Sequence, residues 1–253
     1  MKNFKEIQKY RKTIYSQNGE DGVLDFILSK LNTNGWLVEF GAWDGKYLSN
    51  TFYFIEKKNY KAVLIEGDSS KMPDLYNNTK QFGENVHCLN AFVNPSGENS
   101  LDSLLRKTNI PKEFDVLSID VDGMDYYIWK EFVDYRPKVV IIEINIKDKP
   151  GTDHIHDQQQ KEYVWGHSGS SIDSMTKLAH EKGYALIANV ACNAIYVDNK
   201  YLSLFFNREP STFEAYTYES FDITELSLSE CKQKGTSFYL KKLIKSVLPF
   251  SHK

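Results

Sequence analysis

The sequence lacks several features that mark special classes of protein. No apolar run approaches ~20 residues, the length that a helix needs to cross a bilayer. The first residues, MKNFKE, lack the apolar stretch of a secretory signal peptide. Only three cysteines occur (Cys88, Cys192 and Cys231), without metal-site spacing, and an odd number is typical of a reducing compartment. We therefore expect a cytoplasmic protein without a transmembrane segment.

The sequence also lacks an excess of basic residues. It has 31 Lys and Arg against 34 Asp and Glu, so its formal net charge is −3, and we expect no nucleic-acid partner. No repeat, low-complexity tract or flexible linker interrupts the 253 residues. We therefore expect a single domain over 1–253, with a helical N-terminal segment (1–31), an α/β core (35–200) and a C-terminal extension (201–253).

The stretch WLVEFGAWDG is typical of a strand that enters a glycine turn. Residues 36–40 form a short apolar run with one acid, Gly41 and Gly45 follow, and helical apolar spacing begins at Leu48. Such a unit places a ligand at a helix N-terminus, where backbone N–H groups point outward. Asp44 would repel a pyrophosphate, so the turn favours a cationic or neutral ligand.

A second acid ends the next predicted strand. Residues 61–66 are apolar and finish with Glu66. An acid at the end of the second strand of a βαβ unit accepts hydrogen bonds from the hydroxyls of a ribose. Acids in buried strands are costly without a partner, so Glu39 and Glu66 together predict a nucleoside site.

Strands alternate with helices along most of the chain, which predicts a parallel sheet with right-handed crossovers. The predicted strands are 36–40, 61–66, 86–91, 114–120, 139–144, 184–189 and 193–198. The predicted helices are 22–31, a helix ending near 58, 69–82, 101–107, 124–133 and 171–182.

Four motifs resemble those of the FkbM-type branch of the class I S-adenosylmethionine-dependent methyltransferases. They are SQNGEDG (16–22), VEFGAWDGKYLSN (38–50), LIEGD (64–68) and SIDVDG (118–123). The resemblance covers about residues 15–205. It implies a Rossmann-like class I methyltransferase fold, with a mostly parallel seven-stranded sheet closed by a C-terminal antiparallel hairpin, and S-adenosyl-L-methionine as the cofactor.

The resemblance also assigns roles at the cofactor. Glu39 would lie near the methionine portion, and the two glycines of the turn would face the sulfonium and its carboxylate. Glu66 would hold the ribose, and Asn90 and Ala91 would lie at the edge of the adenine. The full set of expected cofactor-binding residues is Gln17, Glu39, Gly41, Ala42, Asp44, Gly45, Glu66, Gly67, Asn90, Ala91 and Asp120.

Acids also lie at the ends of the fourth and fifth predicted strands. Asp120, Asp122 and Glu143 form an oxygen-rich set that suits Mg²⁺ or Mn²⁺. Such an ion would orient an acceptor hydroxyl and lower its pKa. The chain departs from sugar and macrolide O-methyltransferases that bind a metal here, because Asn145 and Met124 stand about where an acid and a histidine are expected.

Without a metal, a carboxylate or a histidine would act as general base. The expected catalytic residues are therefore Asp120, Asp122 and His167. His154 and His156 are also candidates, but their spacing would point the two rings in opposite directions on a strand. Helix capping is an alternative role for Asp122 or Asp125.

Two segments keep two interpretations each. Gln17 and Asp21 either touch the methionine amino group or the acceptor, or belong to a capped turn that starts the next helix. The basic amphipathic stretch 239–248 is either a docked terminal helix or a contact to a membrane surface or an oligomer.

The prediction for function is a methyltransferase, most specifically an O-methyltransferase. Its acceptor would be a small molecule or a glycan, in particular a bacterial capsular polysaccharide component or its activated precursor, and more narrowly a phosphoramidate group. The sequence leaves open whether the protein forms a homodimer. The rival hypothesis is a methyltransferase fold that serves as a cofactor-binding sensor or as a non-catalytic assembly subunit.

Overall fold

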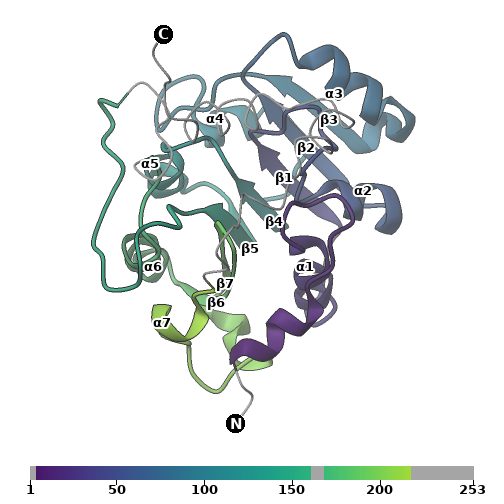
Figure 1. Ribbon diagram of the computed structural model, residues 1–253. Coiled ribbons are helices and arrows are strands. Elements are labelled where there is room, and N and C mark those ends of the chain that lie inside the picture. Colours follow the sequence, from purple (N-terminus) through teal and green to yellow (C-terminus); the bar gives the residue numbers. More distant parts are fainter. Residues whose placement is uncertain (1–3, 161–167, 218–253) are drawn as a thin grey trace, which may run out of the picture.

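The protein is built on a single mixed sheet. The computed structural model describes residues 4–160 and 168–217, and in these residues seven strands form one sheet (Figure 1). The order across the sheet is β3-β2-β1-β4-β5-β7-β6. The strands are β1 (Trp36–Phe40), β2 (Lys61–Glu66), β3 (Val86–Asn90), β4 (Glu113–Ile119), β5 (Arg136–Glu143), β6 (Tyr184–Val190) and β7 (Asn193–Asp198).

Strand directions bring several strand ends to one edge of the sheet. β1 pairs in parallel with both β2 and β4, and β3 and β5 extend the parallel part on either side. β7 is antiparallel to both β5 and β6. The carboxyl ends of β1 to β5 therefore share one edge, which we call the carboxyl edge. The predicted fold class, a mostly parallel seven-stranded sheet with a C-terminal antiparallel hairpin, is confirmed.

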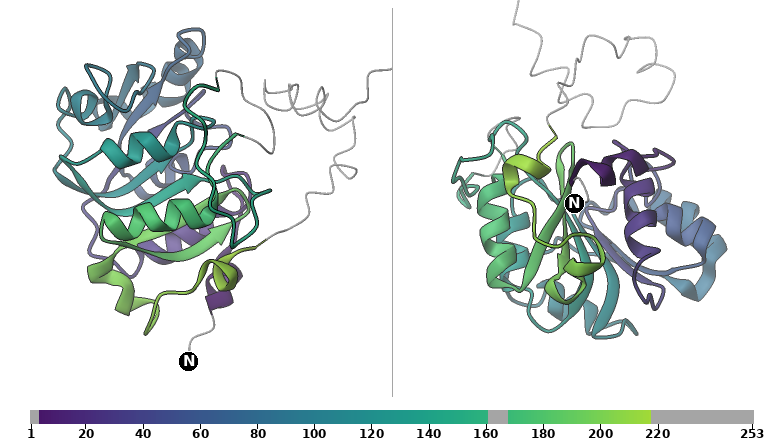
Figure 2. Two further views of the ribbon diagram at one scale, coloured as in Figure 1. Left: turned by 90° about the vertical axis from the view of Figure 1, so that its left-hand side faces the viewer. Right: turned by 90° about the horizontal axis from the view of Figure 1, so that it is seen from below.

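Helices cover both faces of the sheet (Figure 2). One face carries α1 (Glu20–Leu28), α2 (Phe52–Lys58), α3 (Met72–Thr79) and the 3-10 helix η1 (Phe4–Tyr10); the other carries α4 (Leu101–Leu105), α5 (Asp125–Glu131) and α6 (Ile172–Glu181). The remaining described helices are η2 (Lys80–Asn85), η3 (Asn199–Leu204) and α7 (Thr212–Ala215).

Each face buries its own apolar cluster against these helices. Val38 and Phe40 point to the side of α4, α5 and α6, whereas Leu37 points to the side of α1 and α2. This alternation follows from the two-residue period of a strand. Because both faces are covered, β1 is buried from Leu37 to Phe40, and the polar groups that a ligand needs can collect only at the strand ends.

Several predicted helices begin elsewhere than expected; α3, for example, begins at Met72 rather than at residue 69. α1 begins at Glu20 rather than at residue 22, and its apolar residues Val23, Leu24, Ile27 and Leu28 are buried. The helix after β1 was predicted to include Leu48, which is wrong, because α2 begins at Phe52. Leu48 has a φ of 59° and lies 37% exposed in the turn. Helical spacing that starts inside a glycine turn is therefore misleading when the turn has its own hydrogen bonds.

Within residues 4–160 and 168–217, no helix has both the length and the apolar character that crossing a bilayer requires.

Candidate functional site at the carboxyl edge

The glycine turn after β1 needs both of its glycines. Gly41 has a φ of 75°, and a Cβ there would lie 1.8 Å from the carbonyl oxygen of Asp120. Gly45 has a φ of 74°, and a Cβ there would lie 2.4 Å from a methyl carbon of Leu75. Only glycine permits this backbone shape and these close approaches. The turn is therefore held tightly against the ends of β1 and β4.

Glu66 joins the end of β2 to the glycine turn. Its two carboxylate oxygens accept hydrogen bonds from the backbone N–H groups of Trp43 and Asp68, each at 2.7 Å. The side chain is 8% exposed. A carboxylate has about four lone-pair positions, so two remain for hydroxyl donors of a ligand. The predicted ribose acceptor is therefore fixed in position by the turn itself.

Glu39, by contrast, accepts hydrogen bonds from neighbouring protein groups at both of its carboxylate oxygens. Ser49 Oγ at 2.6 Å and Thr51 Oγ1 at 2.7 Å donate to one oxygen, and the N–H of Asn50 donates to the other at 2.8 Å. Burial raises the pKa of Glu39 above its ordinary value, although these bonds act against the rise. Glu39 thus anchors the chain between the glycine turn and α2, directly beneath the site.

The end of β3 forms the outer wall next to Glu66. Asn90 donates from its side-chain amide to the carbonyl of Glu66 at 2.7 Å, and the N–H of Ala91 donates to the same carbonyl at 3.0 Å. The ring of Phe92 lies over Gly67, where a Cβ would come within 2.4 Å of it, and Phe92 is 70% exposed. This exposed ring beside the nucleoside position was missed from the sequence, although an aromatic residue directly after Asn90 and Ala91 was the available signal.

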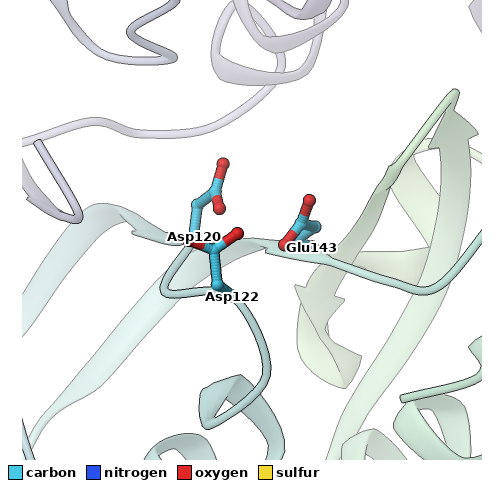
Figure 3. A group of neighbouring side chains, drawn as sticks. All are labelled: Asp120, Asp122 and Glu143. Carbon is cyan, nitrogen blue, oxygen red and sulfur yellow. The ribbon is translucent and has the colours of Figure 1, made fainter. Parts of the chain in front are cut away.

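Three acids from β4 and β5 converge at the same edge, as Figure 3 shows. Asp120, Asp122 and Glu143 each offer a carboxylate oxygen, and these oxygens lie within 4.8 Å of one another. Asp120 and Asp122 follow β4 directly, and Glu143 ends the adjacent β5. Asp122 has a φ of 60°, so the backbone turns sharply where its carboxylate joins the group. The structure therefore brings together the set that the sequence singled out, which we call the acid cluster.

Asp120 and Glu143 hold protons more tightly than isolated carboxyls would. Burial among protein atoms and the nearby charge of Asp125 raise the pKa of Asp120 well above its ordinary value. Burial and the charge of Asp120 do the same to the pKa of Glu143. Asp120 keeps solvent-accessible surface, so water screens part of this effect. A hydrogen bond between the two carboxyls raises the pKa of Glu143 further and acts against the rise at Asp120.

Asp125 organises the turn beneath the acid cluster. Its side chain accepts hydrogen bonds from the N–H groups of Val121 at 2.9 Å and Gly123 at 2.8 Å. The N-cap position of α5 is Met124, which makes no side-chain cap bond. Capping by Asp122 or Asp125 was the alternative prediction; Asp122 lies in the acid cluster, and Asp125 bonds the turn before α5.

The SQNGED segment divides into structural and accessible parts. Asp21 is fully buried, and one of its carboxylate oxygens accepts hydrogen bonds from the backbone N–H groups of Ile14, Tyr15 and Ser16, each at 2.8 Å. Asp21 therefore holds residues 14–16 against the start of α1, whose N-cap is Gly19. Gln17 is the exposed residue between buried neighbours, and adjacent Ser16 bridges to the glycine turn. Gln17 thus remains available to a ligand at this edge.

The remaining candidates are the histidines and the basic C-terminal stretch. His156 is buried: its Nδ1 accepts from the N–H of Gly169 at 3.3 Å, and its ring lies against Gly123. His167 and the stretch 239–248 lie outside the described residues.

The topology and the glycine turn define a Rossmann-like fold of the class I methyltransferase type. A putative caffeoyl-CoA O-methyltransferase from Staphylococcus aureus has a similar structure, with a TM-score of 0.50 and 15% identity over 77% of this chain and 88% of that one. The cyclase SpnF has a TM-score of 0.46 and 9% identity over 72% and 67%. A putative O-methyltransferase from Klebsiella pneumoniae has a TM-score of 0.44 and 11% identity over 78% and 90%.

These comparisons bear on the fold. The first structure shares the Rossmann-like arrangement of this chain. No protein-family model matches the sequence, and no curated protein matches it. Function must therefore be argued from the residues at the carboxyl edge.

Proposed function

We propose that the protein is an S-adenosylmethionine-dependent methyltransferase. The observation that carries the proposal is the arrangement of Glu66: a buried carboxylate at the end of β2, bonded to the glycine turn after β1, with lone pairs left for two hydroxyls. In doubly wound folds this position receives the ribose of a nucleoside. The carboxylate of Asp44 in the same turn disfavours a pyrophosphate, so a nucleoside with a cationic substituent fits better than a dinucleotide.

The residues around this carboxylate would hold the rest of the cofactor. The backbone from Gly41 to Gly45, including Ala42, would face the methionine portion, with Gln17 covering it. Gly67, Asn90 and Ala91 would line the adenine. The exposed ring of Phe92 offers a stacking surface for it. When bound, S-adenosylmethionine supplies a methyl group on a positively charged sulfur.

The acid cluster would form the acceptor side. Asp120 and Asp122 are proposed to contact the acceptor, and Asp120 also reaches toward the cofactor side, because its carbonyl lies against Gly41. Three carboxylates within 4.8 Å fit the preference of Mg²⁺ or Mn²⁺ for oxygen ligands. Asp120, Asp122 and Glu143 would hold such an ion, which would polarise an acceptor oxygen. Transfer itself depends mainly on positioning that oxygen against the methyl carbon.

The finer proposal concerns the acceptor. The FkbM-type motifs support O-methylation of a bacterial capsular polysaccharide component or of its activated precursor, with a phosphoramidate group as the narrowest version. A polyol also suits the acid cluster, because carboxylates accept hydrogen bonds from hydroxyl groups. The odd number of cysteines supports a cytoplasmic enzyme, and a homodimer is compatible with the proposal.

Calorimetry tests the cofactor part of the proposal. We expect the purified protein to bind S-adenosylhomocysteine with micromolar affinity and not to bind NADH. Heat with NADH and none with S-adenosylhomocysteine would refute the proposal.

A transfer assay separates the enzyme from the rival function. S-adenosylmethionine that is tritiated in its methyl group is incubated with the protein and a set of nucleotide-activated sugars, and label in the sugars is counted. Tight cofactor binding together with no transfer to any of a broad set of hydroxyl compounds would favour a sensor or assembly subunit.

A further inference from the structure

A second polar cluster lies just beyond β5 and is not part of the acid cluster. His154 Nδ1 lies 2.6 Å from a carboxylate oxygen of Asp148, and the side-chain amide of Asn145 donates to the same oxygen at 3.1 Å. A carboxylate can only accept, so the proton of a neutral His154 ring resides on Nδ1. The lone pair of the ring then belongs to Nε2, which faces away from Asp148. We call this pair the Asp148–His154 dyad.

The backbone of the dyad is fixed to a helix end. The N–H of His154 donates to Ser171 Oγ at 3.3 Å, and its carbonyl accepts from the N–H of Ser171 at 2.8 Å. Ser171 is also the N-cap of α6 and accepts from the N–H of Ser174. The His154 side chain remains 36% exposed. The imidazole is therefore held firmly on one side and open to an incoming molecule on the other.

The dyad is attached to the same strand end as the acid cluster. Asn145, which bonds Asp148, lies two residues beyond Glu143, the last residue of β5. The N–H of Asn145 donates to the carbonyl of Ser170 at 2.9 Å. The neighbouring N–H of Gly169 reaches His156, whose ring lies against the turn at Gly123. A continuous set of contacts thus connects the dyad with the turn that carries Asp122.

The other described histidines do not combine these properties. His156 is 3% exposed, and its Nδ1 already accepts a hydrogen bond. His87 lies within β3 and stacks on Trp36. His180 bonds Glu209 through Nε2, in the last turn of α6. That turn lies at the opposite edge of the sheet, because Arg136 at the start of β5 donates to the carbonyls of the adjacent residues 182 and 183.

We propose that His154 is the general base for the acceptor and that Asp148 is its positioning residue. This inference rests on the proposed methyltransferase function. The acceptor hydroxyl gives its proton to Nε2 of His154 while its oxygen forms a bond to the methyl carbon. The carbon–sulfur bond breaks, and its electron pair stays on sulfur, which leaves neutral S-adenosylhomocysteine. The positive charge that leaves sulfur appears on the imidazolium, where the carboxylate of Asp148 stabilises it.

The first test needs no acceptor. In the full chain, long-range nitrogen–proton NMR identifies the tautomer of His154, whose signals are assigned by their loss in His154→Gln. We expect Nδ1–H in the neutral ring and at least ~10-fold faster reaction of His154 than of buried His156 with diethylpyrocarbonate, because modification requires an accessible unprotonated nitrogen. An Nε2–H tautomer, or a His154 that reacts no faster than His156, overturns the proposal.

The second test measures transfer to the nucleotide sugar that accepts label from the wild type. We expect His154→Gln to lower kcat by ~100-fold, because a general base contributes ~10²–10⁴ in rate, with the Kd for S-adenosylhomocysteine within twofold of wild type. Asp148→Asn should lower kcat less. Free imidazole should restore part of the activity of His154→Gly, which a purely structural role would not permit. His180→Gln is the matched control and should keep wild-type kcat.

The outcomes separate this proposal from the one on which it rests. Wild-type kcat in His154→Gln overturns the role of His154, even though the cofactor binds. No binding of S-adenosylhomocysteine by the wild type refutes the methyltransferase function and the proposed base with it, whatever the tautomer. If the cofactor binds and no nucleotide sugar is methylated, the tautomer and the reactivity decide on His154.

Discussion

Replacement of Glu66 by alanine is the sharpest perturbation of the proposed cofactor site. Its carboxylate has two lone-pair positions beyond its bonds to the N–H groups of Trp43 and Asp68. Each hydrogen bond to a charged group contributes ~1.5–3 kcal/mol, and water that enters the space left by the side chain recovers part of two such bonds. We therefore expect Glu66→Ala to weaken binding of S-adenosylhomocysteine by ~1–3 kcal/mol, or ~5- to 150-fold in Kd.

Calorimetry measures this change, and circular dichroism checks that the variant is folded. The check matters because the two N–H groups also lose their acceptor. Glu113→Ala is the control: it removes an exposed glutamate at the start of β4, on the opposite edge of the sheet, and should leave the Kd unchanged. A folded Glu66→Ala protein with the wild-type Kd would remove Glu66 from the site and refute the reasoning from its geometry.

Three further predictions concern the metal, a buried ion pair and a tyrosine. If the acid cluster binds an ion, EDTA should abolish methyl transfer, Mg²⁺ or Mn²⁺ should restore it, and S-adenosylhomocysteine binding should survive. Lys138→Met should lower the free energy of unfolding by ~3–5 kcal/mol in urea titrations, because it leaves the buried Asp115, 2.7 Å from the Lys138 ammonium, without its cation. A hydrogen bond to Glu56 raises the pKa of Tyr15 to about 12. The stability that this bond contributes is thus present below pH ~10 and is lost as the pH rises through about 12. In an absorbance titration of the phenolate groups, Tyr15→Phe should lack one step at high pH.

Each of these predictions has a result that contradicts it. Full transfer activity in EDTA would end the metal hypothesis and leave a side-chain base as the explanation. Lys200→Met is the control for Lys138→Met: it breaks an exposed ion pair with Glu113 and should lower the free energy of unfolding by less than ~1 kcal/mol. An equally small loss of stability for Lys138→Met would contradict the role of burial. An unchanged titration for Tyr15→Phe would show that Tyr15 ionises with the ordinary tyrosines.

Much of the fold follows from local patterns in the sequence. β1, β2 and β7 have the predicted bounds, because short apolar runs between turn residues form strands wherever they are buried. Gly41 and Gly45 marked the turn after β1, because only glycine accepts the required φ and contacts. Prediction failed at Leu48, where an apolar residue at helical spacing lies in a left-handed turn. The bonds from Ser49 and Thr51 to Glu39 shape that turn, and spacing alone does not show them.

The site itself depended on which strands become neighbours. Sequence patterns singled out Asp120, Asp122 and Glu143 as acids at strand ends, and Glu39 and Glu66 as acids in strands, since such positions are unusual for charged residues. Only the tertiary structure shows that the carboxylate of Glu39 accepts its hydrogen bonds from the following turn. The carboxylate of Glu66, in contrast, keeps lone pairs for a ligand.

The sequence by itself determined the elements and the residue types at their ends, because both depend on neighbours within a few positions along the chain. The tertiary structure alone decided the pairing of Asp148 with His154 and the fixing of His154 to Ser171. The second contact joins a loop to a helix cap 17 residues further along, and no periodicity specifies a contact of that kind. Their geometry follows from the packing of α6 against the sheet, which places its N-terminus at the carboxyl edge.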